Sequence, residues 1–319
     1  MHRNDVSQSS RVSVIIPTKN RCGELLTTVR SLVRQTVLPS QIVVVDQSPD
    51  NRALRYLQDE LAGIRCVRLD YVYDPLLNGA AAARNRAMDL ATGDFWLFLD
   101  DDVELEAEFI QRLLECYGKR PTARGVSGII TNYPLPSAAS RLWSAIFVRG
   151  PFHDDRQPIY WDCERLRNSE PIAVRKFTSA LMSFRASVIR DIRFDSNYPG
   201  ALAEDIDFCC QLPTGTLMFI APQARLVHNR SPINRARSHW LRIHAEASYY
   251  LYERHWKKQI INRFYFAWLK IGYAVAAVVA SAKARSFHSW RALQAGRLAG
   301  NAYAHPQRTS KGLANHKKP

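Results

Sequence analysis

Residues 78–102 read NGAAAARNRAMDLATGDFWLFLDDD, and this stretch decides the class of fold. Residues 80–90 form an alanine-rich run that is typical of a helix. Residues 95–99 form a short continuous apolar run, which predicts a buried strand, and three aspartates follow it directly. A helix followed by a strand buried on both faces is the repeating unit of a parallel α/β sheet.

Apolar runs and helical patterns alternate on both sides of this stretch. Strands are predicted at 12–16, 42–45, 66–71 and 126–131, and helices at 24–34, after Asp50 to about 59, and at 106–117. Pro17 cannot donate to a central ladder, so the first strand is expected to stop before it. The alternation predicts a Rossmann-like, mostly parallel sheet with helices on both faces. Ligands bind outside the carboxyl ends of such strands, so Asp46 and the aspartate triplet are expected on one rim.

The second half of the chain is less regular. Five prolines at 134, 136, 151, 158 and 171 predict a loop-rich excursion over 132–171. Regular structure is expected again over 173–184, followed by a short helix and a polar loop. A helix around 204–207 and a strand pair at 217–220 and 225–228 complete this half.

Charge is distributed unevenly along the 319 residues. The chain is 46% hydrophobic and 23% charged, which excludes wholesale disorder, and its formal net charge is +15. Residues 1–224 contain 26 basic and 27 acidic side chains; residues 225–319 contain 18 basic side chains and two acids, Glu246 and Glu253. The two parts therefore carry −1 and +16, so the partner that the charge implies belongs to the C-terminal segment.

The cysteines and the N-terminus indicate a compartment. The six cysteines form no CxxC pair, which predicts reduced thiols. The N-terminal MHRNDVSQSSR lacks an apolar run, so we expect no signal peptide and a chain that stays on the cytoplasmic side.

The triplet Asp100-Asp101-Asp102 is the sharpest chemical feature. Three carboxylates repel one another unless a cation offsets them, and alternate residues of an extended chain point the same way. Asp100 and Asp102 could therefore share a hard divalent ion with phosphate oxygens. The alternative is an acidic first turn for the helix that follows.

Glu204-Asp205-x-Asp207 is the second acidic group. A carboxylate beside an acceptor hydroxyl can act as a general base. On spacing alone, helix capping and surface charge are the favoured explanation.

His228 ends an apolar run, where a histidine is usually structural. It becomes a metal-ligand candidate only if the fold brings it to the triplet. The other histidines form no HxxxH or HxH pair, so a zinc site is not expected.

Asn78-Gly79-Ala80 is not a P-loop, because GKS or GKT is missing. A helix that starts with small residues and carries Arg84 one turn in could still meet a diphosphate. A packed alanine-rich helix with a solvated arginine is the alternative.

Five pieces of sequence, taken in order, resemble glycosyltransferase family 2. They are VSVIIPTKNR (12–21), SLVRQTVLPSQIVVVDQS (31–48), residues 78–102 quoted above, SALMSFRASVIRDIRFD (179–195) and AEDIDF (203–208). The resemblance covers 12 to about 230 and is closest to the rhamnosyltransferase-like, envelope-glycan type. It implies the GT-A fold and an inverting reaction.

Carried over residue by residue, the resemblance implies a nucleotide site along the first two strands. Pro17, Thr18 and Asn20 match the first nucleotide-contacting loop. Asp46 matches a carboxylate that recognises the base. Many members have a second aspartate where Gln47 stands, and an amide, which both donates and accepts, leaves the identity of the base open.

The resemblance also implies roles at the reacting centre. Arg84 and Asn85 match the segment beside the diphosphate and donor sugar. Asp100 and Asp102 frame the DxD element, with Asp101 between them, for ribose and a Mn²⁺ or Mg²⁺ ion. On the acceptor side, the resemblance implies Asp205 as the general base, with Glu204 beside it. It also implies His228 as a further metal ligand.

The implied reaction moves one sugar from a nucleotide-sugar donor to a hydroxyl of a lipid-linked or cell-envelope glycan acceptor, with inversion. The QxxRW element of processive synthases is absent, so a single transfer per encounter is expected. Two alternatives are a sugar-phosphate nucleotidyltransferase, whose Gly-rich loop is missing here, and a nucleic-acid-binding protein using the basic segment, which carries no recognised motif. No nucleic-acid partner is therefore expected.

The basic segment predicts contact with a membrane. A helix over 235–258 is followed by aromatic and apolar residues to 282, interrupted by Lys270. This composition favours a helix lying in an anionic membrane interface through 235–285, which would place the protein peripherally on the cytoplasmic face. Packing on the catalytic domain and a true span are the alternatives.

The expected organisation has five parts. These are a flexible N-terminus (1–11), a nucleotide-sugar-binding half (12–131), an acceptor-binding half (132–230), a basic helical segment (231–304) and a disordered tail (305–319).

Overall fold

A computed structural model describes residues 10–156, 166–178, 180–198, 202–233 and 239–305. Residues 1–9 and 306–319, where the sequence predicts flexible ends, lie outside these ranges. The described residues divide into two compact units, one formed by 1–135, 155–196 and 211–235 and the other by 136–154, 197–210 and 236–319.

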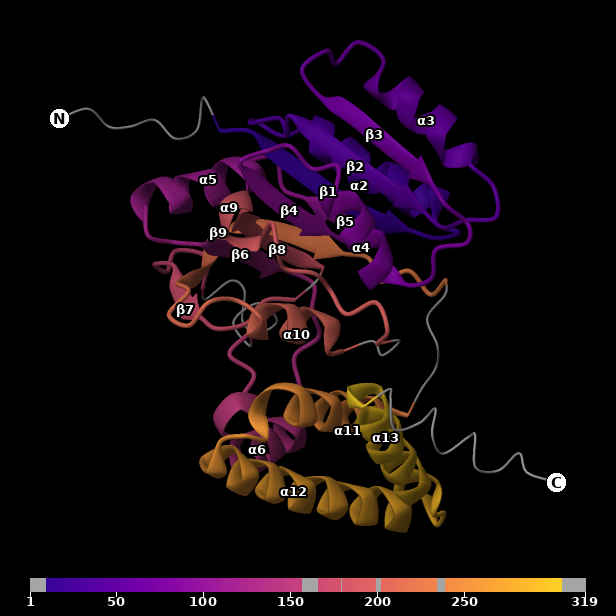
Figure 1. Ribbon diagram of the computed structural model, residues 1–319, viewed down its shortest axis with the longest axis vertical. Helices are drawn as coiled ribbons and strands as arrows, with labels where there is room; N and C mark the ends of the chain where they lie inside the picture. The colour runs from indigo at the N-terminus through magenta and orange to yellow at the C-terminus, as the bar shows by residue number, and fades with distance from the viewer. Residues whose placement is uncertain (1–9, 157–165, 179, 199–201, 234–238, 306–319) are drawn as a thin grey trace. The chain divides into compact units, whose positions relative to one another are not determined.

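The first unit is built on a sheet in the order β3-β2-β1-β4-β8-β6-β9-β5, with β7 paired to β9 (Figure 1). Strands β1, β2, β3 and β4 pair in parallel, β6 pairs in parallel with β9, and β5, β7 and β8 run antiparallel to their neighbours. The predicted mostly parallel sheet is therefore confirmed. The strands are β1 Val12–Thr18, β2 Gln41–Asp46, β3 Arg68–Tyr73, β4 Phe95–Leu99, β5 Val103–Leu105, β6 Gly125–Ile130, β7 Ile172–Val174, β8 Leu181–Arg185 and β9 Met218–His228.

Helices connect the strands of this unit. They are α2 Cys22–Val33, α3 Arg52–Leu61, α4 Ala80–Met88, α5 Phe109–Lys119 and the short α9 Ala186–Ile189. The amphipathic helices bury leucine, valine and phenylalanine side chains, whereas α4 buries small alanines and packs beside β1 and β2. Each parallel strand thus ends at the same edge of the sheet, where the loops to the helices begin.

The first strand extends past Pro17, contrary to the prediction. β1 reaches Thr18, and Pro17 is paired with Val45 of β2. The carbonyl oxygen of Thr18 accepts a hydrogen bond from the backbone N–H of Gln47, next to β2. Because backbone groups alternate in direction along a strand, the backbone nitrogen of Pro17 points toward the other neighbour, β4. The pairing with β4 ends at Ile15, and the missing N–H of Pro17 therefore breaks no ladder.

The predicted strand pair at 217–228 is also wrong, because these residues form one strand. β9 follows β6 in register up to Ile220, and the pairing resumes at Arg225 after an irregularity between Ser127 and Ile129. The extra residues around Pro222 are absorbed as a bulge. Gly128 lies at this point of β6, where a Cβ atom would collide with the carbonyl oxygen of Ala224 and lie 2.8 Å from the ring of Phe109.

Replacing Gly128 by alanine is expected to lower the free energy of unfolding of this unit by about 1–3 kcal/mol, because a methyl group is forced against backbone. Urea denaturation followed by circular dichroism measures this change. Gly23→Ala is the matched control, since nothing lies within 4 Å of the added methyl group there. Equal stabilities of the two variants would contradict the packing described for the bulge.

Helical structure interrupts the predicted loop-rich excursion. The second unit begins with α6 Ala138–Phe147 and the 3₁₀ turn η1 Gly150–Phe152. Pro134 and Pro136 precede the helix, and the Ser137 side chain caps it by accepting a hydrogen bond from the N–H of Ser140. The prolines therefore mark the approach to a helix rather than a continuous loop.

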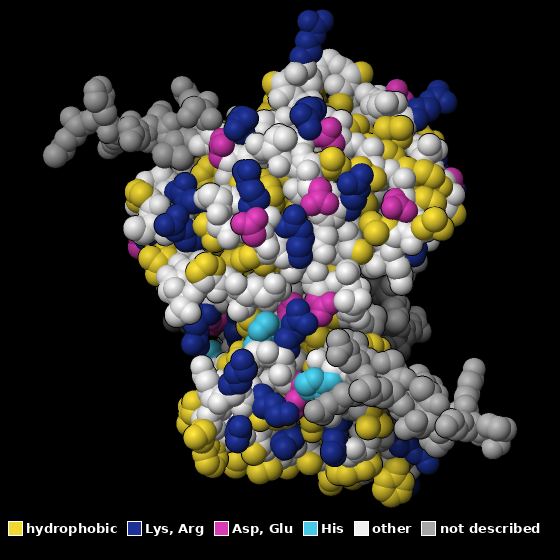
Figure 2. All heavy atoms as spheres, viewed as in Figure 1, with side chains coloured by type: hydrophobic (Ala, Val, Ile, Leu, Met, Phe, Trp, Pro, Cys, Tyr) yellow, Lys and Arg dark blue, Asp and Glu magenta, His cyan; other side chains and the backbone are white. Residues whose placement is uncertain are grey.

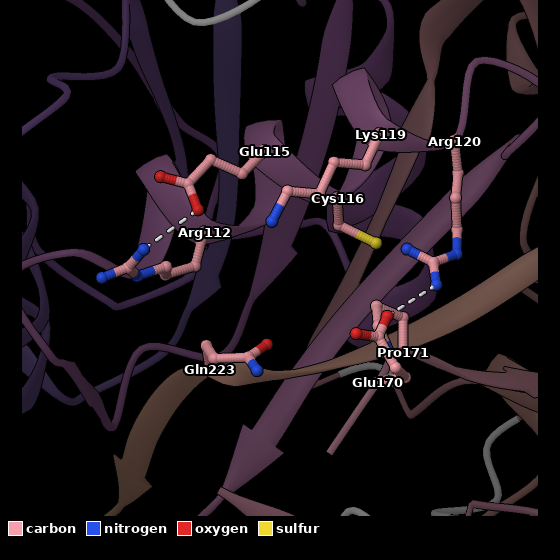
Figure 3. A pocket seen from close by; sticks show the side chains of 8 residues that line it. All are labelled: Arg112, Glu115, Cys116, Lys119, Arg120, Glu170, Pro171 and Gln223. Atoms are coloured by element: carbon pink, nitrogen blue, oxygen red, sulfur yellow. Dashed lines mark hydrogen bonds and ion pairs between the residues drawn. The ribbon is translucent and has the colours of Figure 1, made fainter. Parts of the chain in front are cut away.

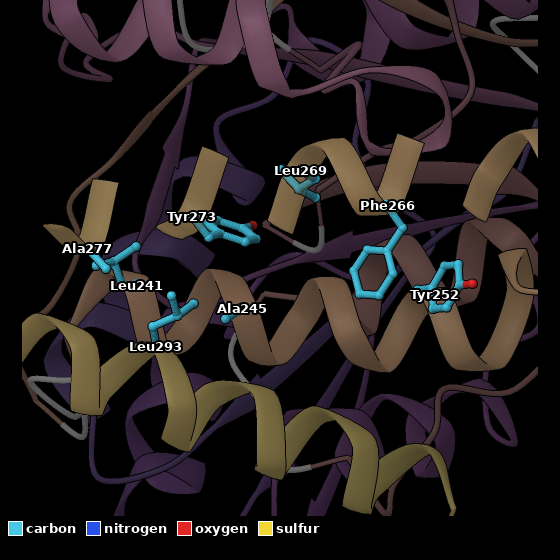
Figure 4. Close-up of a cluster of buried hydrophobic side chains, with 8 residues drawn as sticks. All are labelled: Leu241, Ala245, Tyr252, Phe266, Leu269, Tyr273, Ala277 and Leu293. Carbon is cyan, nitrogen blue, oxygen red and sulfur yellow. The ribbon is translucent and has the colours of Figure 1, made fainter. Parts of the chain in front are cut away.

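The rest of the second unit is helical and confirms the predicted C-terminal helices. It contains α10 Glu204–Cys210, α11 Trp240–Leu251, the π-helical turn η2 Tyr252–Trp256, α12 Ile260–Ala284 and α13 His288–Ala304. Figure 4 shows the core shared by α11, η2, α12 and α13, in which the rings of Phe266 and Tyr252 stack with centroids 4.0 Å apart. Gly296 and Gly300 let α13 approach α11, because a Cβ at either position would meet α11 backbone carbonyls.

Candidate functional site

The aspartate triplet lies where β4 ends and the chain turns into β5. Strand β5 pairs antiparallel with β9, and this register sets Val103 opposite His228. The fold therefore brings His228 to the aspartate triplet, which is what its candidacy as a metal ligand required. A three-residue strand, Val103–Leu105, makes the connection.

Asp100, Asp102 and His228 form one cluster of possible metal ligands. The His228 Nε2 atom lies 3.0 Å from Asp102 Oδ1 and 3.8 Å from Asp100 Oδ2. One ligand atom from each residue lies within 4.8 Å of the others. Two carboxylates and an imidazole form a donor set that suits Mn²⁺, and its oxygens suit Mg²⁺. The residues present thus fit a divalent cation.

The three carboxylates have different environments. Burial raises the pKa of Asp101 to about 6, although Thr18 and Arg21 contact it and lower it in part. Burial also acts to raise the pKa of Asp102, but hydrogen bonding and charge from His228, the N–H of Ser231 and the charge of Arg21 outweigh burial and lower it to about 2. Asp102 is therefore ionised at neutral pH, as a metal ligand must be.

The Asp101 carboxylate contacts Thr18 and Arg21 instead of joining the cluster of Asp100, Asp102 and His228. Its Oδ2 atom accepts a 2.7 Å hydrogen bond from the Thr18 hydroxyl, and its Oδ1 atom lies 2.9 Å from Arg21 Nη1. Asp101 is buried and ties the turn to the loop after β1. Asp101 and Asp102 lie in a turn and not in an extended strand, so the alternation expected for an extended chain does not apply here.

Arg21 is a residue of this site that the sequence reasoning missed. Besides Asp101, its guanidinium contacts Asp102 at 3.7 Å and donates to the carbonyl oxygen of Ile233. Ser231 donates its N–H to Asp102 Oδ2 at 2.7 Å and its hydroxyl to Glu24. The chain after β9 is thereby fastened over the triplet. The only sequence signal for Arg21 is its place directly after Asn20.

The residues predicted to contact the nucleotide lie around the ends of β1 and β2. Asn20 has a left-handed backbone with φ of 59° and donates its N–H to the Ser48 hydroxyl. Both Asp46 oxygens are engaged within the protein, by the N–H of Ser48 and by the hydroxyl of Tyr71. Gln47 is buried, and its Oε1 atom has no hydrogen-bond partner among the described residues.

Arg84 and Asn85 of α4 have different surroundings. Arg84 is buried and donates from Nη2 to Asp100 Oδ1 at 2.9 Å, so the fold brings it to the triplet. The Asn85 amide bonds both the carbonyl and the N–H of Phe194 at 2.9 Å and has no contact with the triplet among the described hydrogen bonds. Asn85 therefore fastens the segment around Phe194 to α4.

Glu204 and Asp205 begin α10, which belongs to the second unit. Asp205 is buried, and its Oδ1 atom accepts the N–H of Ile206 at 2.8 Å, whereas Glu204 is half-buried. Both carboxylates thus lie on the helical unit, and their predicted roles remain predictions.

A cavity of about 160 Å³ lies elsewhere in the first unit (Figure 3). It is lined by side chains of α5, among them Arg112 and Cys116, together with Glu170, Pro171 and Gln223. None of the predicted site residues lines it, and four of its charged residues pair as Arg112–Glu115 and Arg120–Glu170.

The comparison with protein families decides the class. The family model described as glycosyl transferase family 2 matches residues 13–184, which is more than half of the chain. The chain belongs to this family. This family 2 glycosyltransferase carries its acidic triplet within the matched region, and the predicted enzyme class is confirmed.

Known proteins similar to this glycosyltransferase support the same class. It is 30% identical to the succinoglycan biosynthesis protein ExoM of Rhizobium meliloti over 226 residues, 69% of this chain and 67% of the relative. It is 26% identical to the pre-mycofactocin glycosyltransferase of Mycobacterium tuberculosis over 227 residues, 68% of this chain but 42% of the relative.

A solved structure confirms the GT-A fold. The mannosyltransferase of Pyrobaculum calidifontis, solved in complex with GDP-Man and Mn²⁺, matches with a TM-score of 0.57 and 18% identity. The match covers 94% of this chain and 88% of the mannosyltransferase.

Proposed function

We propose that the enzyme is a metal-dependent, inverting glycosyltransferase that moves one sugar from a nucleotide-sugar to a hydroxyl of a lipid-linked or cell-envelope glycan. The observation that carries this proposal is the cluster of Asp100, Asp102 and His228 at the carboxyl end of the parallel sheet. In the proposed organisation, residues 12–131 bind the donor and residues 132–230 bind the acceptor.

The donor side follows from the residues around the triplet. Asp100, Asp102 and His228 would hold the cation, which supplies positive charge to the leaving diphosphate. Asp101, held by Thr18 and Arg21, keeps the turn in place. Gln47 offers a buried amide oxygen near the end of β2, an acceptor for an N–H of the nucleobase.

On the acceptor side, we propose Asp205 as the general base. Asp205 takes the proton of the acceptor hydroxyl while the hydroxyl oxygen forms a bond to the anomeric carbon. The bond from that carbon to the diphosphate oxygen breaks, and the nucleoside diphosphate leaves with the electron pair. The reaction inverts the anomeric carbon and leaves no covalent enzyme intermediate.

Sequence similarity to a glycan-biosynthesis protein and the charge of the C-terminal segment support the proposed class of acceptor. A relative named for the biosynthesis of a glycan, succinoglycan, is 30% identical, and the mannosyltransferase structure holds a nucleotide-sugar and Mn²⁺. Residues 225–319 carry a net +16 charge, which suits an acceptor presented at an anionic surface.

Donor hydrolysis and binding across UDP-, GDP- and dTDP-sugars, each with Mn²⁺ and with EDTA, test the proposed function. We expect one donor to bind only with the metal and to be hydrolysed slowly without acceptor. Absence of metal-dependent binding to every donor in the panel would overturn the assignment of the triplet.

Helix α12 supports our proposal that the protein binds peripherally at a membrane surface. Among the described helices it alone is long and apolar enough to cross a bilayer, and 28% of its most apolar stretch is buried. One face packs on α11 and α13 through residues such as Phe266 and Leu269. The opposite face exposes large apolar side chains at helical spacing: Ile260, Phe264, Trp268, Ile271, Val275 and Val278.

This exposed row, which we call the α12 apolar face, favours a helix lying in the plane of the membrane interface. A spanning helix would have to leave its packing on α11 and α13. Figure 2 shows hydrophobic side chains along the outer edge of the helical unit, with Lys and Arg side chains beside them. Helices α12 and α13 contain five basic residues and no Asp or Glu. This charge complements an anionic lipid surface.

Replacing Phe264 and Val278 together by glutamate is expected to weaken binding to phosphatidylglycerol-containing vesicles at least about tenfold, because each apolar side chain contributes roughly 1.5–3 kcal/mol when buried. Co-sedimentation measures the bound fraction. Both side chains are exposed, 67% and 59%, so the protein should fold normally.

The matched control carries the same charge change on the sheet unit, Tyr56→Glu with Leu76→Glu, at side chains that are 51% and 93% exposed. We expect this control to bind vesicles like the unchanged protein and both to bind less at high salt. If the unchanged protein fails to bind anionic vesicles, the membrane proposal is wrong.

A further inference from the structure

Asp207 is an acidic residue that the proposed chemistry does not use. It lies on α10, two residues after Asp205, and its side chain is fully buried. Its Oδ1 atom lies 2.7 Å from Arg254 Nε and 2.6 Å from His255 Nε2. A buried carboxylate is stable only when such donors compensate it, so this contact is built into the unit.

Both donors come from one unusual turn. Arg254 and His255 are neighbours in η2 Tyr252–Trp256, where the N–H of Lys257 bonds the carbonyl of Tyr252 at 2.9 Å in place of an ordinary α-helical bond. Widened turns of this kind recur at functional sites, because they change the direction of successive side chains. Here two adjacent side chains reach the same carboxylate oxygen.

The same two elements also share an apolar cluster. Ile206 of α10 and Trp256 of η2 each pack against buried residues that include Tyr198 and Tyr250, whose rings stack with centroids 4.2 Å apart. The residues on both sides of Ile206 in sequence are Asp205 and Asp207. The apolar contact at Ile206 and the polar contact at Asp207 therefore hold the short α10 at the two residues that directly follow the proposed base.

We propose that Asp207, through Arg254 and His255, is a positioning residue that fixes the rotation of α10 and with it the carboxylate of Asp205. The proposal rests on the assignment of Asp205 as the base. In this proposal the basic C-terminal helices hold the carboxylate of Asp205 in place. These helices therefore contribute to turnover as well as to contact with a surface.

The test separates kcat from binding. Asp207→Asn keeps the shape of the side chain and removes its charge, and His255→Ala removes one donor. Each is expected to lower kcat about 10- to 100-fold, as for a misplacement of the base by about 1 Å, while the Kd for the nucleoside diphosphate with Mn²⁺ and the KM for the acceptor stay unchanged. His255→Gln, which restores an N–H donor, should recover most of kcat.

The matched control is His305→Ala, which removes a histidine that contacts Glu253 at 2.9 Å in the same unit. It is expected to leave kcat unchanged and to lower the melting temperature less than His255→Ala does, because Asp207 is fully buried whereas Glu253 is 14% exposed. If His305→Ala and His255→Ala lower kcat equally, or if His255→Gln behaves like His255→Ala, the contact is only structural and the proposal fails.

The variant Asp205→Asn distinguishes failure of the positioning role from failure of the proposed base. Loss of turnover in Asp205→Asn with full turnover in Asp207→Asn overturns the positioning role alone. Full turnover in Asp205→Asn overturns the proposed base and the positioning role together.

Discussion

Asp102→Ala is expected to abolish metal-dependent donor binding and to lower kcat/KM by about 10³-fold or more. The side chain is buried, contacts His228 at 3.0 Å and holds the N–H of Ser231, so its removal takes away a charged ligand and the anchor of the chain after β9. A bound cation contributes several kcal/mol of charge stabilisation at a leaving diphosphate, and each 1.4 kcal/mol is about tenfold in rate. Calorimetric titration of the preferred nucleotide, with Mn²⁺ and with EDTA, measures the loss.

Two further variants show whether the loss is due to the metal. Asp100→Asn changes a proposed ligand whose side chain is 26% exposed, and it is expected to reduce Mn²⁺-dependent binding without affecting folding. Asp94→Ala removes an exposed carboxylate whose ion pair within the described part of the chain is with Arg11, and it should bind the donor normally. Metal-dependent binding that survives in both Asp102→Ala and Asp100→Asn would show that the cation is bound elsewhere.

Asp205→Asn is expected to lower kcat by about 10²- to 10⁴-fold, the range usual for the loss of a general base. Donor affinity should remain, because the donor residues belong to the sheet unit and Asp205 belongs to the helical unit. Steady-state transfer to an acceptor glycan, together with nucleotide titration, measures the two quantities separately.

Glu204→Gln is the comparison variant for Asp205→Asn, since it changes the adjacent carboxylate of the same helix. We expect a smaller loss of kcat there, because Asp205 is the buried member of the pair and its carboxylate is fixed by the N–H of Ile206. A larger loss in Glu204→Gln would reverse the assignment of the base.

The sheet was predictable because its strands are buried on both faces. Such strands are continuous apolar runs, and the run at 95–99 coincides with β4 Phe95–Leu99. The position of the acidic triplet followed directly from that strand. Helix α6 was not predictable in the same way, because Pro134 and Pro136 indicate a loop until the cap at Ser137 is seen.

The completion of the site depended on pairing that no local pattern reveals. His228 meets Asp102 because β5, a strand of three residues, pairs with the end of β9. The contact of Arg21 with Asp101 joins residues 80 positions apart. The sequence shows that Asp207 is acidic, but it does not show the π-helical turn η2. The partners of Asp207, Arg254 and His255, could therefore not be predicted.

The division of the described residues into two units has a consequence for chimeras and truncations. The chain passes from one unit to the other at 135/136, 154/155, 196/197, 210/211 and 235/236. No single cut therefore releases an intact module. Ending the protein at residue 235 would leave Tyr198 without Tyr250, and Asp207 without Arg254 and His255. Exchange of the helical unit between relatives would have to transplant three separate stretches together, which makes α10 and the C-terminal helices a single structural block.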